Sequence, residues 1–131
     1  MEKILVYDSN IKIFDAFRSC VIERELKDLE VDLVLRFRDL LNIIGDKQYV
    51  AIVVNLEKEQ EGEVSNTELI HIIKKLNPTL PIVVTTENRS FENERNTRIQ
   101  GVFFYMIEPF NSIEIHAVID EIINKKVERI T

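Results

Sequence analysis

The chain has 131 residues, of which 45% are hydrophobic and 31% charged, and a formal net charge of −6. These values are typical of one soluble globular domain and argue against a disordered chain. The acidic balance disfavours a nucleic-acid surface, and no apolar run approaches the roughly 18 residues of a membrane span. The single cysteine, Cys20, excludes an internal disulfide, and we expect it to be buried on a helix. We therefore expect a cytoplasmic protein without a nucleic-acid or membrane partner.

Short apolar runs recur along the chain and predict buried strands. The run that ends at Leu56 is rich in β-branched residues and has charged neighbours, which predicts a central strand buried on both faces. Val31, Leu33 and Leu35 alternate with their neighbours, as in an edge strand. The strands are expected at 3–8, 31–35, 50–56, 81–86 and 102–107.

Helical spacing and capping residues predict a helix after each of these strands. The expected helices are 11–26, 39–44, 65–76, 87–100 and 111–128, with caps at Ser9 or Asn10, at Ser65 with Glu68, and at Asn111 with Glu114. The helix after Ser65 places Leu69, Ile72, Ile73 and Leu76 on one face. The helix before Gly101 is very polar, and Phe91 and Ile99 are its only expected apolar anchors.

Strands and helices that alternate in this way predict an α/β fold with a doubly wound parallel sheet. The usual flavodoxin-like solution has the strand order 2-1-3-4-5. That order sets the first and third strands side by side, so Asp8 and Asn55 are expected to face one another. We interpret residues 1–131 as one domain of this kind.

The chain resembles the receiver domains of two-component response regulators (CheY-like). The resemblance covers nearly the whole chain and rests on the KILVYD start, the apolar strand ending at Asn55, LNPTLPIVVTT, and GVFFYMIEPF. The last segment is similar to the Gly-x-x-x-Tyr-x-x-Lys-Pro-Phe pattern that closes the fifth strand in the family. The resemblance also implies that the Glu108–Pro109 peptide bond is cis, as the family's Lys–Pro bond is.

In that family an acidic pair holds magnesium, an aspartate accepts the phosphoryl group, a Ser or Thr senses it, and a lysine pairs with it. Here Asp8 matches the first acid, whereas Ser9 stands at the second. Asn55 replaces the phosphoacceptor, Thr86 matches the hydroxyl, and Glu108 replaces the lysine. The resemblance therefore implies a degenerate phosphorylation pocket.

The replacements remove the chemistry of this pocket in several ways. The Asn55 amide is not a carboxylate nucleophile and cannot form an acyl phosphate. Magnesium prefers carboxylate and other hard oxygen ligands, of which Asp8 alone offers an ionised one. Glu108 would repel a phosphoryl group by roughly 4 kcal/mol at an effective dielectric of about 20. We expect a pseudo-receiver that is not an enzyme and has no catalytic residue, bound metal or cofactor.

Two arrangements of the altered pocket are consistent with these residue types. In one, Asn55 bridges the Asp8 and Glu108 carboxylates, and Ser9 and Thr86 complete a hydrogen-bonded set. In the other, Asp8, Glu108 and the Asn55 carbonyl hold a cation or a small amine. His71 and His116 lie on expected helices without a second ligand at metal-binding spacing, and we expect both at the surface.

If the phosphate chemistry is lost, the function should lie in the protein's surfaces. In the family, helix 4, strand 5 and helix 5 form the face through which receivers pair, and Tyr105 matches an aromatic residue that reports switching. Phe103 and Phe104 belong either to this face or to the core. Ile123, Val127 and Ile130 form an apolar stripe on the last helix, which suits a homodimer, another protein partner, or a helix leading to a fused output domain.

The leading hypothesis is a signalling module that acts by protein–protein contact, independently of phosphorylation. One alternative is a phosphoacceptor switch that uses Ser9 or another hydroxyl. A further alternative is a sensor of a small ligand or cation. A flavin or nucleotide site is disfavoured, because Gly45, Gly62 and Gly101 do not form a phosphate-binding loop.

Overall fold

The computed structural model describes residues 1–8, 10–56 and 65–130, with side chains described as far as Lys125. Strands and helices alternate along these residues. The strands are β1 (Glu2–Tyr7), β2 (Leu29–Val34), β3 (Tyr49–Asn55), β4 (Ile82–Thr86) and β5 (Phe104–Ile107). The helices are α1 (Ile11–Glu23), α2 (Phe37–Ile43), α3 (Asn66–Leu76), α4 (Phe91–Ile99) and α5 (Ser112–Ile130).

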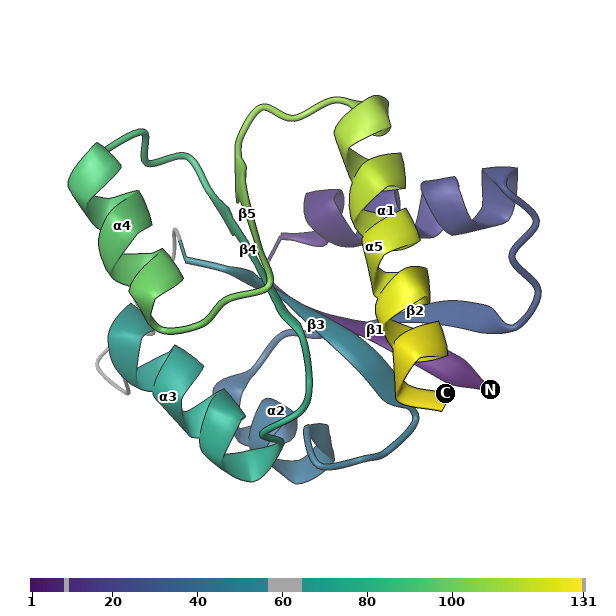
Figure 1. Ribbon diagram of the computed structural model, residues 1–131, viewed down its shortest axis with the longest axis horizontal. Helices are drawn as coiled ribbons and strands as arrows, with labels where there is room; N and C mark the ends of the chain where they lie inside the picture. The colour runs from purple at the N-terminus through teal and green to yellow at the C-terminus, as the bar shows by residue number, and fades with distance from the viewer. Residues whose placement is uncertain (9, 57–64, 131) are drawn as a thin grey trace.

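The five strands form one parallel sheet in the order β2-β1-β3-β4-β5, which confirms the predicted flavodoxin-like fold. Helices α1 and α5 cover one face of the sheet, and α2, α3 and α4 lie on the other side (Figure 1). Because the strands are parallel, the carboxyl ends of all five meet along one edge of the sheet. None of the helices among the described residues combines the length and apolarity that crossing a membrane requires.

Strand β3 supplies the centre of the core, as its apolar sequence predicts. Its residues from Tyr49 to Val54 are all buried. Side chains alternate between the faces of a strand, so Ile52 and Val54 pack toward α2 and α3. Ala51 and Val53 pack toward α1 and α5 in the second core cluster. A strand buried in this way fixes the position of Asn55 at its carboxyl end.

The three predicted helix caps are confirmed by hydrogen bonds to backbone amides. The Lys12 amide donates to Asn10 Oδ1 at 2.9 Å, and the Glu68 amide donates to Ser65 Oγ at 3.2 Å. The Glu114 amide donates to Asn111 Oδ1 at 2.9 Å. Each side chain satisfies a donor that a helix leaves unpaired in its first turn.

Helix α1 was predicted to run to Leu26 but ends at Glu23. The Leu26 amide donates to the Val21 carbonyl, and the Glu25 amide donates to the Ile22 carbonyl. This is the Schellman pattern of helix termination, with Glu25 at φ 54° in the left-handed position. Glycine normally marks that position, so no residue in the sequence signalled the turn. The early stop also lets β2 begin at Leu29, two residues sooner than predicted.

The predicted contacts of two helices are corrected by the observed burial. On α3, Ile70 is buried while Leu76 is 46% exposed. On α4, the expected anchors Phe91 and Ile99 are 81% and 72% exposed. The buried residue of α4 is Thr97, whose hydroxyl donates to the Asn93 carbonyl at 2.8 Å. Helix α4 therefore docks through its polar side and presents its large apolar side chains to solvent.

A group of three polar side chains ties strands β1, β2 and β3 together. The Tyr49 hydroxyl of β3 donates to Asp32 Oδ2 of β2 at 3.1 Å. Lys3 of β1, which lies between these strands, pairs with the same carboxylate at 3.5 Å. Burial, followed by the charge of Asp32, raises the pKa of Tyr49 to about 12.

We predict that Tyr49→Phe lowers the free energy of unfolding by about 1 kcal/mol at neutral pH, because the hydrogen bond is lost. The raised pKa of folded Tyr49 stabilises the fold below pH 10. This stabilisation is lost as the pH rises toward about 12. Urea denaturation near pH 7 and at about pH 11 should show that the wild type loses more stability than the variant. Equal losses would contradict the assignment.

Candidate functional site

The predicted pocket residues lie at the carboxyl ends of four strands. Asp8 follows β1, Asn55 ends β3, Thr86 ends β4, and Glu108 follows β5. The parallel register pairs Tyr7 with Val54, which brings the next residues of the two strands, Asp8 and Asn55, together. Asp8 is only 6% exposed, so its carboxylate requires partners within the protein.

Both carboxylate oxygens of Asp8 accept hydrogen bonds. Asn55 Nδ2 donates to Asp8 Oδ2 at 3.1 Å, and the Asn10 amide donates to Asp8 Oδ1 at 3.1 Å. An aspartate at position 55 would have no donor for this contact at neutral pH, whereas the amide of asparagine has two. The Asp8–Asn55 part of the predicted hydrogen-bonded set is therefore confirmed. Ser9 lies outside the described residues.

Hydrogen bonds of Thr86 and Glu108 link the two connections that follow β4 and β5. Thr86 is 1% exposed, and its Oγ1 accepts from the Asn88 amide at 3.0 Å. Its carbonyl accepts from the Glu108 amide at 2.7 Å. Arg89 Nη2 donates to the Glu108 carbonyl at 3.3 Å. The Glu108–Pro109 peptide bond is cis, as predicted.

Thr85 is a buried residue at this edge of the sheet that the sequence analysis missed. It pairs with Asn55 in the parallel register, is fully buried, and lies beside the Asp8–Asn55 pair. Its Oγ1 has no hydrogen-bond partner among the described residues. The sequence did signal it, because two threonines end the strand and alternation places them on opposite faces. The family pattern directed attention to Thr86 alone.

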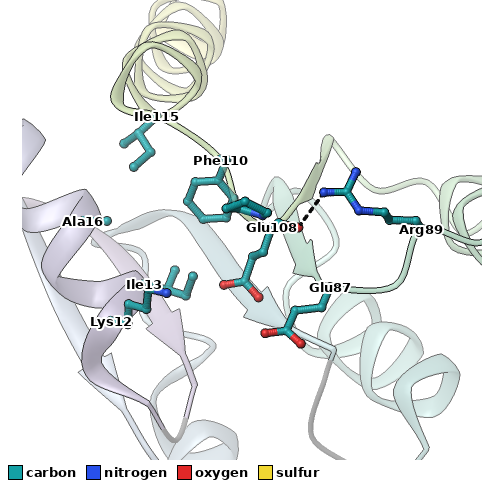
Figure 2. Close-up of a pocket in the computed structure, with 9 residues that line it drawn as sticks. Lys12, Ile13, Ala16, Glu87, Arg89, Glu108, Phe110 and Ile115 are labelled. Atoms are coloured by element: carbon teal, nitrogen blue, oxygen red, sulfur yellow. Dashed lines mark hydrogen bonds between the residues drawn. The ribbon is translucent and has the colours of Figure 1, made fainter.

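A pocket of about 390 Å³ opens beside this edge, between α1 and the connections that follow β4 and β5. Glu87 and Glu108 both point their carboxylates into the space in front of α1 (Figure 2). The sequence analysis identified Glu108 but missed Glu87, which it treated as part of a polar segment. The remaining lining residues are Lys12, Ile13, Ala16, Arg89, Pro109, Phe110 and Ile115.

The residues predicted for switching and interaction are buried or partly buried where their side chains are described. Tyr105 is 7% exposed, its hydroxyl accepts from Asn93 Nδ2 at 3.2 Å, and the Arg98 guanidinium lies 5.5 Å from its ring centre. Phe103, Phe104 and Ile123 pack against the core cluster under α1 and α5. The side chains of Val127 and Ile130 lie outside the described ones. An interface role for these six residues stays a prediction.

Cys20 is buried, as predicted, and lies between α1 and α5. Its Sγ is 3.2 Å from His116 Nδ1, so His116 is partly covered rather than fully at the surface. Burial raises the pKa of the Cys20 thiol above its ordinary value. No three His, Cys, Asp or Glu side chains in the described part of the chain are placed to hold a metal ion. The Cys20–His116 hydrogen bond links α1 with α5.

The fold is similar to solved structures of receiver domains. A CheY-like response regulator receiver domain protein from Methanospirillum hungatei matches with a TM-score of 0.76 and 19% identity, over 98% of each chain. A two-component response regulator from Clostridium difficile gives 0.78 and 20%, over 95% of this chain and 97% of that chain. The beryllofluoride-activated NtrC4 receiver domain dimer gives 0.78 and 18%, over 93% and 96%. No protein-family model and no curated protein matches the chain.

We predict that Asn55→Asp destabilises the protein by about 1–3 kcal/mol at neutral pH. The variant loses a donor to Asp8 and places a second carboxylate beside it. The loss of stability should be smaller at lower pH, because protonation of one of the two carboxyl groups restores a hydrogen-bond donor. Denaturant unfolding near pH 7 and about pH 5 tests this, with Asn96→Asp on the exposed side of α4 as the control. A variant as stable as the wild type would contradict the Asp8–Asn55 contact.

Proposed function

We propose that the chain is a receiver-like signalling module that acts by protein–protein contact, independently of phosphorylation. The observation that carries this proposal is the hydrogen bond from Asn55 to Asp8 at the carboxyl ends of β3 and β1. The receiver family places its phosphoacceptor aspartate at the position of Asn55. In this chain the position holds an amide, and the amide already satisfies the neighbouring acid.

Glu108 adds a second argument against phosphate chemistry at this edge. It stands where the family has a lysine, and its carboxylate shares a pocket with that of Glu87. Two carboxylates at the mouth of the site would raise the free energy of a phosphoryl group rather than lower it. The module therefore adopts its interacting form without this modification.

The interaction surface that we propose is the outer side of α4 and the start of α5. Phe91, Ile99 and Ile113 are 81%, 72% and 75% exposed. Phe91 and Ile99 are eight residues apart, which places them on the same side of α4. The similar NtrC4 receiver domain forms a dimer. A homodimer through this face buries side chains that the monomer leaves in water, at about 2 kcal/mol for each fully buried one.

The first test concerns phosphorylation. We expect no gain in intact mass when the protein is incubated with acetyl phosphate and magnesium, because Asn55 cannot act as the nucleophile. Asn55→Asp alone should also remain unmodified, because Ser9 and Glu108 still oppose the chemistry. The triple variant with Ser9→Asp and Glu108→Lys is the matched attempt to restore it. A phosphoryl group on Ser9 or Thr86 of the wild type would instead support the hydroxyl-switch alternative.

The second test concerns assembly. We expect light scattering at high micromolar concentration to give the mass of a dimer, and Phe91→Glu or Ile99→Glu to give a folded monomer. Ile22→Glu is the matched control, since Ile22 is 60% exposed on α1. It should leave the dimer intact. A monomeric wild type, or a control as disruptive as the α4 variants, would contradict the proposed interface.

A further inference from the structure

We propose that α4 pairs with the α4 of a second copy of the chain in an antiparallel arrangement, with a two-fold axis that passes beside Arg95. This inference rests on the proposed function, because it takes the exposed face of α4 as the interface, and it adds the orientation of the partner. Helix α4 lies at one border of the molecule, with β4 and β5 on its inner side (Figure 1). Its outer side is therefore placed to meet another chain.

The outer side of α4 carries one stripe of three exposed side chains. Phe91, Arg95 and Ile99 follow one another at a spacing of four residues. A helix turns by about 100° per residue, so Arg95 lies between the other two. Thr97, the buried residue of α4, points about 160° away from Arg95. The stripe thus has an apolar side chain at each end and a positive charge at its centre.

A two-fold axis at the centre of this stripe makes it complementary to itself. An axis that crosses α4 at Arg95 reverses the direction of the partner helix and brings Phe91 of each copy beside Ile99 of the other. These side chains are 81% and 72% exposed in the monomer. Both ends of the contact therefore remove apolar surface from water.

The charges beside the stripe favour the antiparallel orientation over a parallel one. Glu92 and Arg95 are exposed, and neither forms an ion pair with another described residue. They are three residues apart, so they are neighbours on the helix surface. In an antiparallel pair the same flank of both helices meets, and Glu92 of each copy reaches Arg95 of the other. These two ion pairs offset the repulsion between the Arg95 side chains at the axis.

A parallel pair would set opposite flanks against each other. Glu92 would then face Glu94 of the partner copy, and the two Arg95 side chains would meet without a carboxylate between them. Glu94 is already paired with Arg98 of its own helix at 2.8 Å. The macrodipoles of the two helices would also point in the same direction, which is unfavourable for adjacent helices.

The length of α4 sets the strength of this contact. The helix has nine residues and is about 14 Å long. A contact of this size falls below the roughly 800 Å² per partner that is typical of stable complexes. We therefore expect a weak dimer, with a dissociation constant of about 10–100 µM.

Single cysteine substitutions measure the orientation. Facing Cα atoms of two packed helices lie roughly 5 Å apart, a distance that a disulfide can span. Arg95→Cys should therefore give a covalent dimer on mild oxidation, seen as a doubled intact mass. Asn96→Cys is the matched control, because this exposed neighbour points about 100° away from the axis and should stay monomeric. Ile99→Cys should also stay monomeric, whereas a parallel pair would join its two copies. The native Cys20 is buried in all of these variants.

Charge reversal tests the two ion pairs. Glu92→Lys and Arg95→Glu should each weaken self-association at least about tenfold, because each creates two pairs of like charges. An equimolar mixture of the two variants should form a heterodimer, since every substituted side chain then faces an opposite charge. Analytical ultracentrifugation and native mass spectrometry measure both results. Glu23→Lys, an equal change of charge on the exposed side of α1, is the control and should leave the dimer unchanged.

The outcomes separate this orientation from the interface itself. The antiparallel arrangement is overturned if Arg95→Cys forms no covalent dimer, if Ile99→Cys forms one as readily, or if the mixed variants stay apart. The α4 interface would survive these results as long as Phe91→Glu still converts a wild-type dimer into a monomer. A monomeric wild type would overturn both the interface and its orientation.

Discussion

The parallel pairing of β1 with β3 is the constraint on which the rest of the structure depends. It brings the ends of two buried strands together and leaves the Asp8 carboxylate with little access to water. A buried carboxylate without partners would raise the free energy of the fold by several kcal/mol. Asn55 and the Asn10 amide supply the donors. The same edge that positions catalytic groups in other open α/β sheets is here stabilised by hydrogen bonds within the protein.

The sequence predicted the fold well because buried parallel strands have an unambiguous pattern. Continuous apolar runs and capping residues predicted the alternation of strands and helices, and the strand order was taken from the usual flavodoxin-like solution. The errors in the predicted helix ends and contacts occur where a conformation lacks its usual sequence signal. Glu25 takes a left-handed conformation without being glycine. Helix α4 docks through Thr97 and Asn93, so its apolar residues were misassigned to the core. Polar docking of this kind leaves no periodic hydrophobic pattern to detect.

The candidate site was predicted in part. Strand ends are readable from sequence, so Asp8, Asn55, Thr86 and Glu108 were placed correctly at one edge. Thr85 was missed because its contribution depends on which face of β4 it occupies. Glu87 was missed for another reason: it belongs to an irregular connection, and its direction follows from hydrogen bonds that sequence does not encode locally. The position of a residue at a strand end was thus predictable, whereas the face that it occupies and the direction of a side chain farther along a connection were not.

The hydrogen bonds between the two connections have a consequence for communication within the molecule. The connection that carries Glu87 and Arg89 leads directly into α4 at Ser90, whose hydroxyl accepts from the Asn93 amide at 3.2 Å. Asn93 in turn donates to the Tyr105 hydroxyl. A displacement of this connection therefore reaches the first turn of α4 through a short covalent path. By thermodynamic reciprocity, if dimerisation through α4 changes the affinity of this edge for a ligand, binding of that ligand changes the dimerisation constant by the same factor.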